Sequence, residues 1–257
     1  MIVKTEAVVL KSRRYRETSK IVTVYSRKFG KISGIAKGAR ETKSKFGAAL
    51  EPMTHVSLVI YKKEHRDLHL ISQSEIVQLF SHLHSNLARI TAGLSVVELI
   101  DAAMHDEEPS EAVFRLLLQV LAELDAATKN LQNVLYYFRL RLLDLMGFKP
   151  DFQACARCRK RLSRGTSDDM PVYFDAQAGG ILCRNCAVKY SRSVKLPFRT
   201  VKILQELQHA SLSELTSIEI PAASQAEIEE ILKAYIKFHL AGVSRLQTEG
   251  MSKILAV

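Results

Sequence analysis

Two cysteine pairs constrain this chain more than any other feature. Cys155 and Cys158 form one C-x2-C pair, and Cys183 and Cys186 form a second after an interval of 24 residues. A two-residue spacer lets both thiolates of a turn face one ion, and two such turns complete a tetrahedral site. The spacing therefore predicts one structural zinc ion, with no position left for a catalytic water. Four unligated thiols, or a redox pair, are the alternatives.

The segments between the pairs favour a small zinc-ribbon module. Residues 171–174 and 179–182 are predicted to form a hairpin that carries the second cysteine turn. Basic residues crowd the cysteines and are expected to lower the pKa values of the thiols. They are Arg157, Arg159, Lys160, Arg161, Arg164 and Arg184.

The chain is expected to work in the cytoplasm, associated with the nucleoid. No apolar run approaches the roughly 18 residues that span a bilayer. The opening MIVKTEAVVLKS places charges where a signal peptide needs its apolar core. Cysteines in a reducing compartment bind metal more readily than they form disulfides.

The first 80 residues alternate apolar and polar side chains with the period of β-strands. Strands are predicted at Val3–Leu10, Lys20–Ser26, Lys31–Ala36, Thr54–Tyr61 and Asp67–Glu75. Five short strands separated by glycines fit one small barrel, most often an OB-fold, which commonly binds single strands.

From about residue 81 the apolar period changes to that of helices. Three helices are predicted before the cysteines, the second capped by Ser110 and the third ending at Gly147. Two more follow the cysteines, at Phe198–His209 and at Ile228–Val243, the last opened by a capping box of Ser224 and Glu227. The fold class predicted is α+β multidomain, with an N-terminal five-stranded OB-fold barrel and an α-helical body into which a four-cysteine, zinc-ribbon-like module is inserted. The domains expected are 1–80, 81–150, 151–195 and 196–257.

The net charge of +10 is concentrated in two segments, 1–80 at +9 and 149–203 at +8. Residues 11–45 alone hold 12 Lys and Arg against Glu17 and Glu41, with Tyr15, Tyr25, Phe29 and Phe46 among them. Single-strand binding combines such cations for phosphate with rings for base stacking. For Tyr25 and Phe29 individually, a place in the core is favoured. The candidate DNA-binding residues are Arg13, Arg14, Arg16, Lys20, Lys37, Arg40, Lys43 and Lys45.

Signatures of enzymes are absent from the sequence. It contains no phosphate-binding loop, no dinucleotide fingerprint, no H-E-x-x-H and no G-x-S-x-G. We therefore expect a protein that is not an enzyme. An RNA-directed OB and zinc-ribbon factor of translation or transcription remains an alternative, as does a zinc-dependent hydrolase if a coordination position is open.

Several segments, in order along the whole chain, resemble the bacterial RecO family of recombination mediators. They are TEAVVLKSRRYRETSKIVTVYS, GKISGIAKGARETKS followed by LEP, LDLMGFKPDFQACARC and FDAQAGGILCRNC. The resemblance implies an OB-fold, a helical body and a zinc finger. It also implies binding of single- and double-stranded DNA, annealing of complementary strands, and loading of RecA in DNA repair. The partners implied are RecR and the C-terminal tail of single-stranded-DNA-binding protein.

Matched by position, the family's segments make Arg14, Arg16, Lys37, Arg40 and Lys43 the best DNA contacts. The family often has a second basic residue after Gly-Ala-Arg, where this chain has Glu41. The resemblance therefore leaves the path of the phosphates open at that point.

Overall fold

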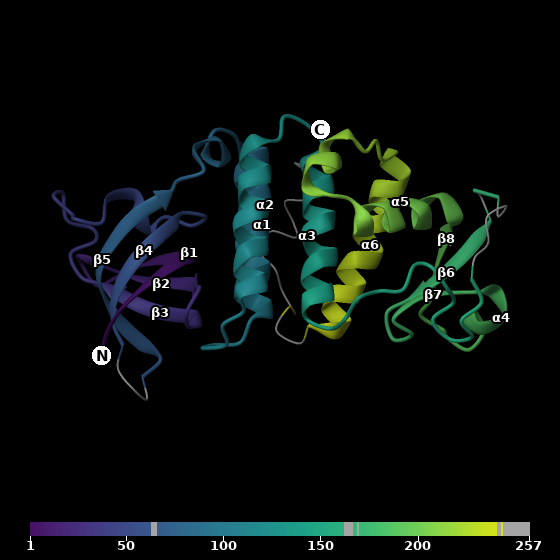
Figure 1. The fold of residues 1–257 in the computed structure, drawn as a ribbon, viewed down its shortest axis with the longest axis horizontal. Helices are drawn as coiled ribbons and strands as arrows, with labels where there is room; N and C mark the ends of the chain where they lie inside the picture. Colours follow the sequence, from purple (N-terminus) through teal and green to yellow (C-terminus); the bar gives the residue numbers. More distant parts are fainter. Residues whose placement is uncertain (63–65, 162–166, 169, 241–242, 244–257) are drawn as a thin grey trace. The chain divides into compact units, whose positions relative to one another are not determined.

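The computed structural model describes residues 1–62, 66–161, 167–168, 170–240 and 243. The chain divides into two compact units, Met1–Ala126 and Ala127–Ser244, with the division between the second and third long helices (Figure 1). Arg164 of the predicted cation cluster lies outside the described residues. The domain boundaries expected after residues 80, 150 and 195 stay predictions.

The first unit is built on a closed barrel of five strands (Figure 1). The strands are β1 (Ile2–Tyr15), β2 (Ser19–Ser26), β3 (Gly30–Ala36), β4 (His55–Tyr61) and β5 (Leu68–Gln78). The order around the barrel is β1-β2-β3-β5-β4, with β3 and β5 parallel and the other neighbouring strands antiparallel. The predicted OB-like barrel is confirmed, and β1 runs five residues further than its predicted end at Leu10.

The extension of β1 matters for the site because only β2 pairs with it there. β4 pairs with Ile2 to Val8, whereas β2 pairs with Ala7 to Tyr15 across a bulge between Val9 and Lys11. A bulge bends its strand and increases the local twist. The end of the β1–β2 hairpin therefore carries its side chains beyond the part of the barrel that β4 closes.

Because apolar and polar residues alternate along the strands, the β-branched and aliphatic side chains point inward and fill the barrel. Val9, Val22, Val24, Leu58 and Ile60 are among the buried members of one core cluster. The short 3-10 helix η1 (Gly47–Leu50) and the residue before it add Phe46 and Leu50 to that cluster.

Two helices pack within the same unit, α1 (Leu87–Ala103) and α2 (Glu111–Ala126). The segment at the predicted start, Ser81–His84, is a 3-10 turn, and α1 begins after Asn86, whose side chain accepts the N–H of Arg89. Gly30, at φ +65°, lies so close to the chain before α2 that a Cβ would fall 2.3 Å from the carbonyl oxygen of Glu108. The loop before α2 therefore closes directly on the barrel.

The second unit contains α3 (Leu131–Leu145), α5 (Phe198–His209) and α6 (Ala222–His239). The predicted capping box at Ser224 is wrong, because α6 begins at Ala222 after Pro221, and Ser224 is buried 3.0 Å from the hydroxyl of Thr200. A capping box does form at Ser211 and Glu214, at the start of the 3-10 helix η3 (Leu212–Ser217).

The cysteine segment forms a three-stranded sheet with one short helix. The strands are β6 (Pro171–Asp175), β7 (Gly180–Leu182) and β8 (Val194–Pro197), in the order β7-β6-β8, and the helix is α4 (Arg184–Ala187). The predicted hairpin is confirmed as β6 and β7, and β8 is an additional strand. In the part of the chain that the structure describes, no helix has the length and apolar character that crossing a membrane requires.

Candidate metal centre and nucleic-acid surface

The four cysteines meet at one point of the second unit. Their Sγ atoms all lie within 4.8 Å of one another, and Sγ of Cys158 is 3.8 Å from Sγ of Cys183. A tetrahedron with metal–sulfur bonds of about 2.3 Å has sulfur–sulfur edges of about 3.8 Å. The thiols are free rather than joined as disulfides. Their geometry fits a metal ion with four sulfur ligands.

The local electrostatics also suit a cation. Burial raises the pKa of the Cys155 thiol, but hydrogen bonds from the backbone N–H groups of Cys158, Cys183 and Arg157 outweigh it and lower the pKa to about 6. The thiol of Cys186 has its pKa raised to about 12, chiefly by its hydrogen bond with Cys183. Four thiolates so close together repel one another, so they need the positive charge of an ion to lose all four protons.

Asp151, which the sequence reasoning missed, organises the first cysteine turn. One carboxylate oxygen accepts the N–H groups of Gln153 and Ala154 at 2.9 and 3.1 Å, and the other accepts from the guanidinium of Arg159 at 2.8 Å. Its backbone also joins the β6–β7 hairpin, since Ile181 N–H donates to the carbonyl of Asp151 at 2.9 Å. Asp151 thus ties the turn that holds Cys155 and Cys158 to the strand before Cys183. An aspartate side chain often accepts the backbone N–H groups of the residues two and three positions later in a turn. The position of Asp151 just before the first cysteine pair is therefore the local signal that indicates this role.

Replacing Asp151 by alanine is expected to weaken metal binding by about 10- to 100-fold, the usual cost of losing a group that orients metal ligands. The four sulfur ligands stay in place, so the metal stoichiometry at saturation should not change. Competition with a chromogenic chelator measures the affinity. Asp168→Ala is the matched control, because that exposed carboxylate contacts Lys202 and not the cysteine turns. An Asp151→Ala affinity equal to that of the control would contradict the assigned role.

All eight candidate DNA-binding residues lie at one end of the barrel, on the β1–β2 hairpin end and the loop after β3. Arg14 pairs with Lys20 across β1 and β2, and Lys20 pairs with Ala36 at the end of β3. The backbone N–H of Arg40 donates to the carbonyl of Thr18 at 2.9 Å, which joins the loop to the hairpin turn. The structure therefore brings two sequence segments into one basic surface, here called the barrel-end patch. Its members are Arg13, Arg14, Arg16, Lys20, Lys37, Arg40, Lys43 and Lys45.

Two members of the barrel-end patch make contacts that stabilise the fold. The ammonium of Lys20 is 2.7 Å from the carboxylate of Glu51, and its side chain is only 19% exposed. The guanidinium of Arg40 donates to the carbonyls of Arg16 and Glu17 at 3.0 and 2.7 Å, which stabilises the hairpin turn. The sequence predicts Arg40 as a DNA contact, and these hydrogen bonds give it a structural role as well.

The other six cations of the patch are exposed and free for an anion. Within the described part of the chain, none of their charged groups lies within ion-pair distance of a carboxylate. The guanidinium of Arg16 lies over the ring of Tyr15 at 5.3 Å, and the ammonium of Lys45 lies over Phe46 at the same distance. These six are Arg13, Arg14, Arg16, Lys37, Lys43 and Lys45.

In the basic segment 11–45, the cations near residue 30 form ion pairs within the first unit. Arg27 makes a two-pronged ion pair with Glu111, at 2.8 and 2.7 Å, and Lys31 is 3.3 Å from a carboxylate oxygen of Asp106. Both partners belong to α2 or the loop before it. Part of the excess charge in residues 11–45 therefore neutralises acids that follow 84 and 75 residues later in the chain.

Most of the aromatic residues in the run belong to the interior. Tyr25 and Phe46 are 0% and 3% exposed, and the hydroxyl of Tyr25 accepts the N–H of Ser110 at 3.1 Å. Burial raises the pKa of Tyr25. Core placement of Tyr25 is confirmed, and Tyr15, half-buried beside Arg16, is the ring within the barrel-end patch.

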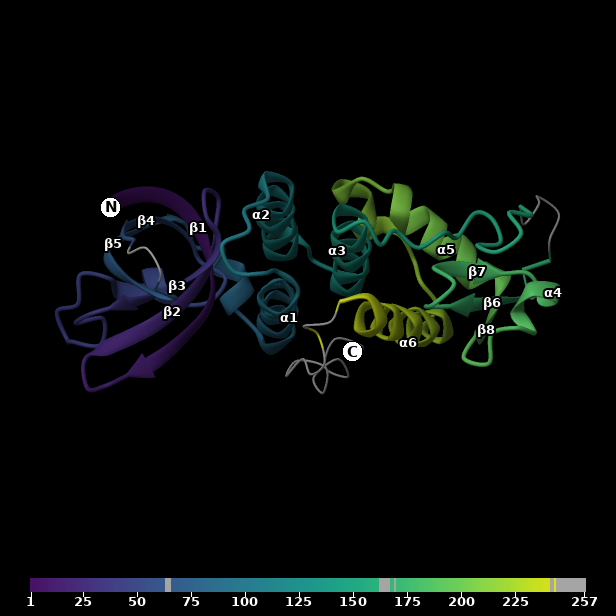
Figure 2. The ribbon, with the colours of Figure 1, turned by 90° about the horizontal axis from the view of Figure 1, so that it is seen from below.

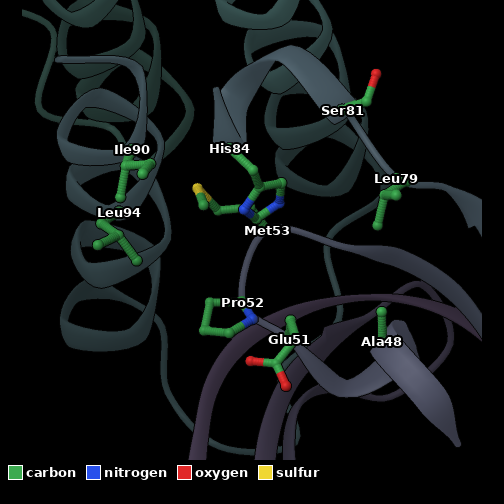
Figure 3. A pocket seen from close by; sticks show the side chains of 9 residues that line it. All are labelled: Ala48, Glu51, Pro52, Met53, Leu79, Ser81, His84, Ile90 and Leu94. Carbon is green, nitrogen blue, oxygen red and sulfur yellow. The ribbon is translucent and has the colours of Figure 1, made fainter. Parts of the chain in front are cut away.

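An apolar pocket of about 430 Å³ lies elsewhere in the first unit, between the segment after η1 and α1. Figure 3 shows Met53 and His84 close together in it, with Ile90 and Leu94 on the neighbouring helix. None of the eight candidate DNA-binding residues lines this pocket. Its lining is mostly apolar and includes the carboxylate of Glu51, so it does not suit phosphate.

Comparison with known families covers both parts of the chain. Residues 1–80 match the family described as recombination protein O N terminal, and residues 84–247 match recombination protein O C terminal. The chain belongs to the RecO family. The two matches together correspond to the barrel and to the helices with the cysteine module.

Full-length relatives agree with this membership of the RecO family. A protein named DNA repair protein RecO from Alkaliphilus metalliredigens is 29% identical over 99% of this chain and 100% of its own length. Proteins of the same name from Desulforamulus reducens and Salinibacter ruber are 32% and 34% identical over 93% and 92% of this chain, and over 90% and 88% of their own lengths.

Proposed function

We propose that this protein is a DNA-binding mediator of recombinational repair that acts without catalysing a reaction. The observation that carries the proposal is the barrel-end patch, in which six unpaired cations and Tyr15 meet on an OB-like barrel. Cations of this kind bind phosphates, and a neighbouring ring adds stacking on a base. Membership of the RecO family, whose relatives are named DNA repair proteins, supports the same function.

The mediator is proposed to anneal complementary single strands and to help RecA load on strands coated by single-stranded-DNA-binding protein. Its partners in this proposal are RecR and the C-terminal tail of that coating protein. Annealing of complementary strands coated by the binding protein is the decisive experiment, because neither an RNA-directed factor nor a hydrolase accounts for it. Coated strands that anneal no faster with the protein than without it would contradict the proposal.

The binding of single-stranded DNA is expected to be strongly salt-dependent. If about five phosphates are neutralised by the barrel-end patch, log K should fall with log salt at a slope of about −3.5. Fluorescence anisotropy of a labelled oligo-dT at several salt concentrations measures the slope. A flat salt response, or tighter binding of the matched RNA strand, would show that the patch does not serve single-stranded DNA.

The metal ion is proposed to be one structural zinc held by Cys155, Cys158, Cys183 and Cys186. Four thiolates at tetrahedral spacing suit zinc, and they leave no open position for a bound water. The ion would fix the two cysteine turns against β7 and α4, since Cys155 packs with Leu182 and Ala187 in a small core cluster. Zinc therefore stabilises the module rather than activating a nucleophile.

A further inference from the structure

The second unit contains a cleft of about 710 Å³ between the cysteine module and α6. One wall comes from the first cysteine turn and the segment after α4, and the other comes from the last turns of α6. Figure 2 shows an end of α6 beside the sheet β6–β8. A volume of this size takes a ligand as large as a nucleotide, rather than a single side chain (about 300–1,000 Å³).

Four cations surround the cleft, and they come from three separate segments. Arg157 lies in the first cysteine turn, Lys189 and Arg192 follow α4, and Lys237 lies on α6. All four are exposed, and in the described ranges of the chain no carboxylate lies within ion-pair distance of their charged groups. Four unpaired positive charges around one concavity attract an anion.

One carboxylate lines the cleft, but it is buried and accepts a hydrogen bond from the backbone. Asp175 is 3% exposed, and its oxygen accepts the N–H of Ala178 at 2.8 Å in the turn after β6. Its charge offsets one of the four cations, so the concavity keeps a positive balance.

Two aromatic rings and an apolar floor complete the cleft. Phe238 on α6 is 53% exposed, and Tyr190 is half-buried on the opposite wall. Phe174 and Ile231 form the buried floor. An accessible phenylalanine costs free energy in water, and stacking on a base would cover it.

We propose that this cleft is a second binding site for single-stranded DNA, separate from the barrel-end patch. The cations would bind phosphates, and Phe238 and Tyr190 would stack on an unpaired base. An acidic peptide is the rival ligand, but accessible rings combined with distributed cations and nucleotide-sized space favour a nucleic-acid strand. The proposal depends on the proposed function in one respect, which is that the bound strand is DNA rather than RNA. It goes beyond that function by giving one chain two strand-binding sites, which is what holding two strands for annealing requires.

The first test removes the barrel-end site and measures what remains. In the full chain carrying Arg13→Gln, Arg14→Gln, Arg16→Gln, Lys37→Gln, Lys43→Gln and Lys45→Gln, which lacks all six free cations of the barrel-end patch, anisotropy should still detect binding of a labelled dT octamer at 0.1 M salt. Adding Arg192→Glu and Lys237→Glu should lower this residual affinity by about 25-fold, the loss expected for two phosphate contacts at that salt concentration. Adding Phe238→Ala instead should lower it at least about 5-fold, since one stacking ring is lost.

The matched control reverses two charges in the same unit away from the cleft. Lys195 follows Val194 on β8, and alternation directs it to the other face of the strand, while Lys129 contacts Glu219 at the surface. Lys129→Glu with Lys195→Glu should change the residual affinity by less than about 2-fold. Equal losses in the control and cleft variants would overturn the proposal.

The second test measures whether one protein holds two strands. Donor- and acceptor-labelled dT strands cannot pair with each other, so energy transfer between them requires bridging by the protein. The otherwise unchanged chain should bridge them, and Arg192→Glu with Lys237→Glu should abolish bridging while the barrel keeps the salt slope of single-strand binding. Unchanged bridging in that variant would overturn the second site and leave the proposed function standing. A labelled glutamate-rich peptide that binds through the cleft when the dT octamer does not would assign the cleft to an acidic protein segment instead.

Discussion

Reversing the charges of Arg14 and Lys37 together is expected to weaken binding of single-stranded DNA by about 25-fold at 0.1 M salt. Each phosphate contact adds about 0.7 log units of affinity for every tenfold decrease in salt concentration. Relative to 1 M salt, where this contribution is about zero, two lost contacts therefore remove about 1.4 log units at 0.1 M. The salt slope should also become shallower, from about −3.5 to about −2.1, because three of five contacts remain. Anisotropy titrations of oligo-dT at several salt concentrations measure both quantities.

These two residues are chosen because their substitution leaves the fold intact. Both are exposed, and neither pairs with a carboxylate in the part of the chain described. Arg40 would be a poorer choice, since its guanidinium holds the carbonyls of the hairpin turn, and its loss would unfold that turn as well as remove a charge.

The control makes the same change of net charge at the other end of β1. Lys4 is exposed opposite Val59, and Arg66 is exposed shortly before β5, on the side where β1 begins. Lys4→Glu with Arg66→Glu should change the affinity by less than about 3-fold and keep the slope near −3.5. If control and patch variants lose affinity equally, the DNA senses net charge alone and the barrel-end patch is not a site.

If the four cysteines hold zinc as proposed, replacing Cys155 by serine is expected to release the ion and unfold the cysteine module. Structural zinc contributes about 10–16 kcal/mol of apparent binding free energy in small zinc domains at neutral pH. That is of the same size as the whole stability of a typical domain, about 5–15 kcal/mol. Cys155 is 1% exposed within the small core cluster, so the serine hydroxyl would also be buried without its metal. Metal analysis of the purified protein and amide exchange across residues 151–161 and 170–197 measure the two effects.

A conservative exchange of another ligand separates metal binding from packing. Cys158 is exposed, so an imidazole has room there and can ligate zinc. Cys158→His should retain zinc with lower affinity, whereas Cys158→Ala should lose it. The barrel should keep its salt-dependent DNA binding in every cysteine variant. Zinc retained in full by both Cys155→Ser and Cys158→Ala would refute the four-sulfur site, and loss of all DNA binding with a folded barrel would move the main DNA surface to the second unit.

Local patterns were enough to predict the barrel, the helices and the cysteine cluster. Alternation in Lys20–Ser26 has the period of a strand, and that segment is β2 almost residue for residue. The C-x2-C spacing acts within one turn, so each pair could be assigned without knowing the rest of the fold. Helix ends were less certain, because Ser224 and Glu227 have the spacing of a capping box but serve a buried contact with Thr200 instead.

The tertiary structure decided which residues of each pattern remain available. Arg14 and Arg27 belong to one basic run, yet Arg27 is held by Glu111 on α2 while Arg14 stays free. Likewise the cleft joins Arg157 to Phe238, two residues whose sequence positions give no sign that they meet. The physical reason is that strand period and turn spacing depend on neighbours in the chain, whereas ion pairing, burial and cleft formation depend on groups brought together from distant segments. The sequence by itself determined the barrel and the four-sulfur cluster, and the tertiary structure decided which charges and rings can meet a strand of DNA.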